Sequence, residues 1–304
     1  MAIPEKMQAD FLEYISPDCD RLAFLQNYLL KNGVKSTVLQ IEGKNHLYVN
    51  FPSTSYDPTF KIKTVVTHYD RVKGTPAAND NSAANLMIAD FAVELSKNTF
   101  RNHNIRIIFT DGEELGEGGV TEQGAFSLAE RLKKNGLVTD NVFVFDSCGR
   151  GTVAVLSTAG TESKIKGKFK NDFFDLYERA QELLNSSSAT GFSSWMTLPT
   201  PYSDNAGFLA CGVPAVLITF LPKEEATLYF KNLMADKTLE KFVKNCDSAL
   251  SVEDEIFKFK YKEKMPVTWR MFHTEMDNHL SLTEESFDFM RKILLSLAFR
   301  KDLA

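Results

Sequence analysis

The hydrophobic positions along this chain follow two alternating patterns. Short, nearly continuous apolar runs predict strands buried on both faces, at 61–68, 104–110, 141–146 and 214–220. Elsewhere apolar residues recur every three or four positions, which predicts helices at 18–33, 81–95, 123–132, 171–184, 204–211, 222–249 and 282–299. Two shorter runs, 36–41 and 46–51, flank Glu-Gly-Lys-Asn and predict a β-hairpin.

Alternation of buried strands with helices is typical of α/β proteins. We therefore predict an α/β fold with three α/β/α layers, in which helices cover both faces of a mixed, mainly parallel central sheet. No linker-like or low-complexity stretch interrupts the chain, so residues 1–304 are expected to form a single domain. Lysines alternate with other residues at 164–170 and 257–262, and this period of two predicts strands with one solvated face.

The composition narrows the class of protein. A hydrophobic content of 43% and a charged content of 25% are typical of globular proteins. The net charge of −5 argues against nucleic acid as a partner, because nucleic-acid binding requires a basic surface. The polar N-terminus and the absence of a run of ~20 apolar residues predict a cytoplasmic protein without a membrane partner.

The cysteines predict no disulfide and do not identify a binding partner. The four cysteines are far apart and form no CxxC pair, so we expect free thiols rather than disulfides or a thiolate zinc site: Cys19, Cys148, Cys211 and Cys246. Small molecules or peptides are the expected partners. The sequence does not determine the oligomeric state.

Chemically active side chains follow three of the predicted strands directly. These are His68 and Asp70 after the first, Glu113 and Glu114 after the second, and Asp146 after the third. Ligands of open α/β sheets bind beyond the carboxyl ends of the strands, so these side chains are expected to meet at one edge. Asp80, in the loop that opens the next helix, adds another carboxylate.

Carboxylates gathered in this way repel one another, and a bound cation relieves the repulsion. Imidazole and carboxylate ligands together suit zinc or a similar transition metal better than calcium. The adjacent Glu113 and Glu114 also suggest a division of labour, in which one binds metal and the other acts as a general base.

As an ordered set, these motifs resemble the di-zinc exopeptidase family, which includes bacterial leucyl aminopeptidases, glutamate carboxypeptidase and glutaminyl cyclase. The resemblance extends from about residue 61 to the C-terminus. It rests on His68-x-Asp70, Asn79-Asp80-Asn81, Glu113-Glu114, Asp146, Ser203-Asp204-x-x-x-Phe208 and His273-Thr274. The chain departs from the family at Asn205, where a histidine is usual.

The resemblance implies a zinc-exopeptidase-like catalytic domain that hydrolyses N-terminal residues from peptides. It implies two zinc ions bridged by Asp80, one completed by His68 and Glu114 and the other by Asp146 and His273. Glu113 would act as the general base, and Asp70 would orient the His68 ring. It also implies a cis peptide bond between Asp80 and Asn81.

Two other functions stay open: a glutaminyl cyclase with a single zinc ion, and a catalytically silent relative that binds peptides. The long stretch 114–124 and the motif His273-Thr-x-x-Asp277-Asn278 favour the cyclase, whereas Phe272, in place of a tryptophan, favours the aminopeptidase. Tyr202 is a candidate for substrate binding, as a donor to the developing oxyanion. Cys148 is expected to be a buried structural thiol.

Overall fold

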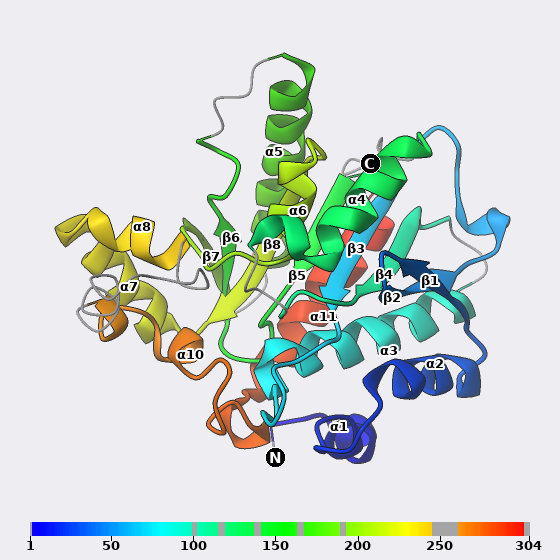
Figure 1. The fold of residues 1–304 in the computed structure, drawn as a ribbon, viewed down its shortest axis with the longest axis horizontal. Coiled ribbons are helices and arrows are strands. Elements are labelled where there is room, and N and C mark those ends of the chain that lie inside the picture. Colours follow the sequence, from blue (N-terminus) through cyan, green and yellow to red (C-terminus); the bar gives the residue numbers. More distant parts are fainter. Residues whose placement is uncertain are drawn as a thin grey trace.

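A single mixed sheet forms the centre of the molecule (Figure 1). The computed structural model describes residues 2–98, 102–114, 119–136, 141–162, 167–188, 193–244 and 261–300. The strands lie in the order β1-β2-β4-β3-β5-β8-β6-β7. Their bounds are β1 Lys35–Ile41, β2 Lys44–Asn50, β3 Lys63–His68, β4 Ile105–Thr110, β5 Asn141–Phe145, β6 Val153–Ser157, β7 Ser194–Leu198 and β8 Ala215–Leu221.

The middle of the sheet is parallel. Strands β4, β3, β5 and β8 run in one direction, whereas β1, β2 and the β6–β8 pair supply the antiparallel contacts. The predicted fold class is therefore confirmed. The helices are α1 Gln8–Tyr14, α2 Arg21–Lys31, α3 Ala83–Lys97, α4 Gly124–Lys134, α5 Lys168–Ser188, α6 Asp204–Ala210, α7 Lys223–Ala235, α8 Thr238–Lys244, α10 Val267–Arg270 and α11 Glu284–Phe299.

Helices cover both faces of the sheet because its central strands are apolar on both sides. Val65 of β3 packs into the core formed with α2, α3, α5 and α11, while its neighbour Val66 packs into the core formed with α4 and α6. Ile107 and Ile108 of β4 divide between the two cores in the same way, as alternation along a strand requires. This arrangement explains why the strands appear in the sequence as continuous apolar runs.

The predicted hairpin is present, with a tighter turn than its sequence indicated. Ile41 pairs with Lys44, so only Glu42 and Gly43 form the turn. Both have positive φ angles, 50° and 82°, as a two-residue type I′ turn requires. The same hairpin joins the sheet through β2 and β4.

Several predicted elements need correction. Lys168 and Lys170 lie in helix α5, so the predicted strand at 164–170 is wrong there; Lys164 and Lys166 lie outside the described residues. Residues 257–260 of the other lysine-rich stretch also lie outside them, and residues 261–262 are helical. The sequence patterns missed α1, β6 and β7. These are short elements of five or seven residues, and an edge strand such as β7 is only partly buried.

Within the described ranges, no helix has both the length and the apolar character needed to cross a membrane. Cys19, Cys148 and Cys211 are free thiols, and Cys246 lies outside those ranges. The Cys148 side chain is fully buried, with Sγ 3.4 Å from the carbonyl oxygen of Ile218, as expected for a structural thiol.

We predict that His103 makes the fold sensitive to acid. Burial, and secondarily the charge of Lys63, lowers the pKa of His103 from 6.5 to about 4, and its Nδ1 accepts a hydrogen bond from the backbone N–H of Ile105. The unfolded chain gains a proton at His103 below pH 6.5, whereas the folded protein resists protonation until about pH 4. The stabilisation, of the order of 3 kcal/mol, is complete above pH 6.5 and is lost as the pH falls through this window.

The measurement is urea unfolding of the wild type and of His103→Asn between pH 7 and pH 4. Asparagine offers an acceptor but does not titrate, so the advantage of the wild type should shrink as the pH falls. A constant difference between the two proteins across this range would contradict the prediction.

Candidate metal centre

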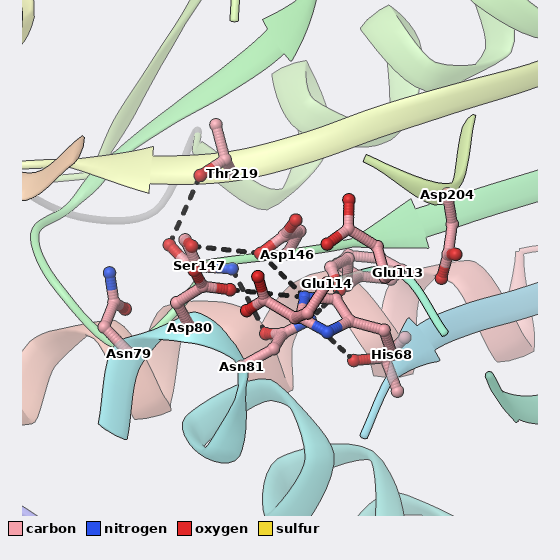
Figure 2. Close-up of polar contacts among 12 residues, drawn as sticks. His68, Asn79, Asp80, Asn81, Glu113, Glu114, Asp146, Ser147, Asp204 and Thr219 are labelled. Carbon is pink, nitrogen blue, oxygen red and sulfur yellow. Dashed lines mark hydrogen bonds and ion pairs between the residues drawn. The ribbon is translucent and has the colours of Figure 1, made fainter. Parts of the chain in front are cut away.

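The carboxyl ends of three neighbouring parallel strands bring the predicted site residues together (Figure 2). His68 is the last residue of β3 and lies beside Thr110, the last residue of β4. Asp146 follows the last residue of β5 directly. The side chains predicted from the strand ends therefore converge at one edge of the sheet.

Asp80 reaches the same edge from a helical turn, residues 78–82, which precedes α3. The peptide bond between Asp80 and Asn81 is cis, which confirms the prediction. The Asn81 amide holds this turn to both neighbouring strands: it donates to Thr67 Oγ1 and to the carbonyl oxygen of Phe145, both at 3.0 Å. Its oxygen accepts from the backbone N–H of Ser147 at 3.2 Å. Asn81 thus links the residues next to His68 and Asp146.

Asp277 fixes the same turn from the other side. Its carboxylate accepts hydrogen bonds from the backbone N–H groups of Asn79 at 2.8 Å and Asp80 at 3.0 Å. The carbonyl oxygen of Asp277 also accepts from the N–H of Ala78. Because Asp277 lies four residues after His273, these bonds join the loop of Asp80 to the loop of the late histidine.

Two overlapping groups of ligand-type atoms share Asp80. In the first, His68 Nε2 lies 3.2 Å from Asp80 Oδ1 and 3.7 Å from Asp146 Oδ1. In the second, His273 Nε2 lies 2.7 Å from Glu114 Oε2 and 3.5 Å from Asp80 Oδ2. The two oxygens of one carboxylate thus face different histidines.

This grouping differs from the one that the family resemblance implied. We expected His68 with Glu114 and Asp146 with His273, but the closest contacts pair His68 with Asp146 and His273 with Glu114. His68 also lies in a third group, with Glu113 and Glu114, so the whole set is compact.

Asp70 supports both a histidine and a glutamate. One of its oxygens lies 3.6 Å from His68 Nδ1, and the other accepts a hydrogen bond from the backbone N–H of Glu114 at 2.9 Å. This position fits the expected role of orienting the His68 ring, and it also ties the end of β4 to the end of β3.

The cluster attracts positive charge strongly. Contacts with Asp80 and Glu114 raise the pKa of His273 to about 11, even though burial opposes this. Burial also opposes protonation of His68, yet the surrounding carboxylates raise its pKa well above 6.5. For Asp80, burial is outweighed by contacts with both histidines, and its pKa is lowered. Protons on the histidines thus offset the crowded carboxylates, which a divalent cation can also do.

The residues present fit a metal ion. Among the residues that the structure describes, His68 Nε2 and Glu114 Oε1 are buried atoms without a hydrogen-bond partner, although buried polar atoms are normally satisfied. Each histidine faces two carboxylates, and this nitrogen and oxygen donor set suits zinc. The geometry therefore supports a metal centre assembled from His68, Asp80, Glu114, Asp146 and His273.

Glu113 lies beside these groups without sharing their closest contacts. Burial raises its pKa well above the usual range, and the charges of Glu114 and nearby aspartates add to the effect. Its Oε1 accepts a hydrogen bond from the Gln123 amide at 3.2 Å. Gln123 precedes Gly124, the first residue of α4, which lies against the end of β4 so closely that a Cβ there would be only 1.7 Å from the Asp111 carbonyl oxygen. A carboxylate held this way can accept a proton next to a metal ion.

Three further residues lie near the centre: Gln123, which no sequence motif indicated, and Asp204 and Asp277, which belong to the family-like motifs but had no predicted role. Asp204 is fully buried at the start of α6, where it accepts a hydrogen bond from Thr110 Oγ1, and burial raises its pKa to about 7. Its place in the Ser203-Asp204 motif was the available signal. Tyr202 is partly buried just before this motif, and its role in substrate binding stays a prediction.

The chain is similar to known proteins in its sequence family and in its fold. The model of peptidase family M28 matches residues 51–298. Among solved structures, the Legionella pneumophila LapA aminopeptidase superposes with a TM-score of 0.60 at 13% identity, covering 98% of this chain and 71% of that one. BSAP, a zinc aminopeptidase from Bacillus subtilis, gives a TM-score of 0.53 at 16% identity, covering 86% and 51%.

The Porphyromonas gingivalis glutaminyl cyclase gives a TM-score of 0.58 at 14% identity, covering 96% of this chain and 94% of that one. A search of curated proteins found no significant match. At these identities the solved structures establish the fold that the chain shares with them. The resemblance predicted from the sequence motifs is confirmed by the family model.

We predict that Asp277 is essential to the stability of this loop assembly. Asp277→Ala leaves the buried N–H groups of Asn79 and Asp80 without their acceptor, and each such group costs about 1–3 kcal/mol. The free energy of unfolding should fall by about 2–4 kcal/mol in urea denaturation. Asp277→Asn keeps one acceptor oxygen and should lose less, so equal stabilities of the two variants would argue against this role.

Proposed function

The chain belongs to peptidase family M28, and from this premise we propose that it is a zinc-dependent aminopeptidase that removes N-terminal residues from peptides. One observation carries the proposal: two ligand groups, each with one histidine, share the two oxygens of Asp80. Each group would hold one metal ion, and Asp80 would contribute to both.

His68, Asp80 and Asp146 would hold one zinc ion, and Asp80, Glu114 and His273 the other. Zinc supplies Lewis acidity, which polarises a scissile carbonyl group and makes a nearby water easier to deprotonate. Asp70 Oδ1 lies 3.6 Å from His68 Nδ1 and would orient the ring so that Nε2 stays directed toward Asp80.

Glu113 acts as the general base. It removes a proton from the attacking water and delivers that proton to the leaving amine as the peptide bond breaks. The Gln123 amide holds one carboxylate oxygen of Glu113, so the other is available for proton transfer. Burial favours proton retention by Glu113 between these two steps.

The charge of the site supports action at a free N-terminus. Carboxylates outnumber histidines among the residues that line the metal centre, and a protonated or metal-seeking α-amine complements them. We therefore expect peptides and amino-acid amides with an unblocked N-terminus to be substrates, and N-acetylated peptides to be poor ones.

A glutaminyl cyclase with one zinc ion is the second candidate. The fold of this chain matches that of the Porphyromonas gingivalis cyclase over 94% of that protein, and that of the LapA aminopeptidase over 71%. The proximity of Asp146 to His68, which completes a second ligand group, favours the aminopeptidase.

Metal content and substrate choice separate these candidates. The protein is stripped with a chelator, reloaded with zinc, freed of excess metal and assayed for zinc by atomic spectroscopy. We expect about two zinc ions per chain and hydrolysis of aminoacyl arylamides. About one ion per chain, with cyclisation of glutaminyl peptides and no arylamide hydrolysis, would establish the cyclase instead.

Replacing Glu113 tests its assignment as the base. Glu113→Gln should retain the zinc content of the wild type but lose 10²–10⁴-fold in kcat, because amide nitrogen cannot accept the proton. Glu122→Gln is the matched control, since Glu122 is an exposed residue nearby, and it should have the kcat of the wild type. Near wild-type turnover by Glu113→Gln would refute the assignment.

A further inference from the structure

The N-terminal helices contact the back of the metal centre, although they precede the region that matches the family model, residues 51–298. Helix α2 packs along α3, whose N-terminus carries the turn of Asp80 (Figure 1). Arg21 opens α2 and is only 5% exposed. Within the described part of the chain, Arg21 forms no ion pair with a carboxylate, so its charge is buried without a direct counterion.

Arg21 contacts the aromatic ring of Tyr14 and the hydroxyl group of Ser82. Its guanidinium carbon lies 4.4 Å from the centre of the Tyr14 ring, and Nη2 donates a hydrogen bond to Ser82 Oγ at 2.9 Å. Nε and Nη1 are buried and have no hydrogen-bond partner in the described ranges of the chain. Burying a cation in this way is costly, so a compensating interaction is expected.

Ser82 transmits this contact to the site. Its hydroxyl donates to the carbonyl oxygen of Ala77 at 2.5 Å, and its backbone N–H donates to the same oxygen at 3.1 Å. These bonds close the turn that contains Asp80, two residues before Ser82. Arg21 therefore holds Ser82, which closes the turn that contains Asp80.

A second route leads from the same helices to the strand ends. Asn85 donates to the Tyr14 hydroxyl at 3.2 Å and accepts from Thr67 Oγ1 at 3.1 Å. Thr67 precedes His68, and its hydroxyl accepts from the Asn81 amide at 3.0 Å. Tyr14 is thus connected through buried hydrogen bonds to neighbours of both His68 and Asp80.

A second arginine connects the loop after β3 to the N-terminal segment. Arg71, which follows Asp70, donates hydrogen bonds to three successive carbonyl oxygens between α1 and α2: those of Ile15 at 3.0 Å, Ser16 at 2.7 Å and Pro17 at 2.9 Å. One arginine thus reaches from the site loop to the N-terminal segment, and Arg21 reaches in the opposite direction.

We propose that Arg21 is a positioning residue for the metal centre, through which the N-terminal helices hold the turn of Asp80 in the geometry that metal binding requires. Its contacts with the Tyr14 ring and the Ser82 hydroxyl join the N-terminal helices to this turn. The inference rests on the metal centre of the proposed function, but it concerns metal affinity rather than the reaction.

The test is zinc affinity of the full chain, measured by competition with a chromophoric chelator. Arg21→Met should weaken zinc binding by 10–100-fold, as loss of a group that orients metal ligands typically does. Arg21→Lys retains the charge and should recover part of the loss. Arg291→Met is the matched control, because Arg291 forms an exposed ion pair with Glu94 on the helices α11 and α3; its affinity should stay within twofold of the wild type.

A second variant, Ser82→Ala, keeps the test valid if Arg21→Met misfolds. Ser82→Ala removes the acceptor of the Arg21 hydrogen bond, and the double variant should lose less affinity than the two single losses combined. Circular dichroism of the zinc-free proteins checks that each is folded. Zinc affinities within twofold of the wild type for both single variants would overturn the proposal, whereas a wild type that binds no zinc would overturn the proposed function.

Discussion

Repulsion between carboxylates at one edge of the sheet is the constraint on which the structure depends. Asp80 faces both histidines, one from each of its oxygens, while Asp146 lies near His68 and Glu114 near His273. Without positive charge between them, these groups could not all remain ionised so close together. The site is therefore organised around one shared carboxylate and the cationic charge that it requires.

The scaffold positions this centre in two ways. His68 and Asp146 are located by parallel strands, whose backbone pairing leaves little freedom. Asp80 and His273 lie in connecting segments and need other support, which Asp277 provides by hydrogen bonding to the turn of Asp80. The hydrogen bond from Arg21 to Ser82 connects the same turn to the N-terminal helices. The turn of Asp80, whose carboxylate faces both histidines, is thus held by residues from two distant parts of the chain.

Much of the fold and the site was predictable, for identifiable reasons. Apolar runs marked β3, β4 and β5 because both of their faces are buried. The cis bond after Asp80 followed from the family motif. The lysine alternation at 164–170 was misleading because a period of two over so few residues does not exclude a helix, and Lys168 begins α5. Strand β7 gave no clear signal because it lies at the edge of the sheet and only Leu198 among its residues is buried. Strand β6 is buried throughout and was missed although it is as long as β5.

The sequence by itself determined which residue types gather at the site and their order, because strand ends in a parallel sheet converge wherever the strands occur. Only the tertiary structure decided which of these candidate ligands lie together: His68 lies closest to Asp80 and Asp146, and His273 to Glu114. That choice depends on how two distant loops meet at Asp277, and no local pattern encodes it. The contact between Arg21 and Ser82 likewise arises only from the packing of α2 on α3.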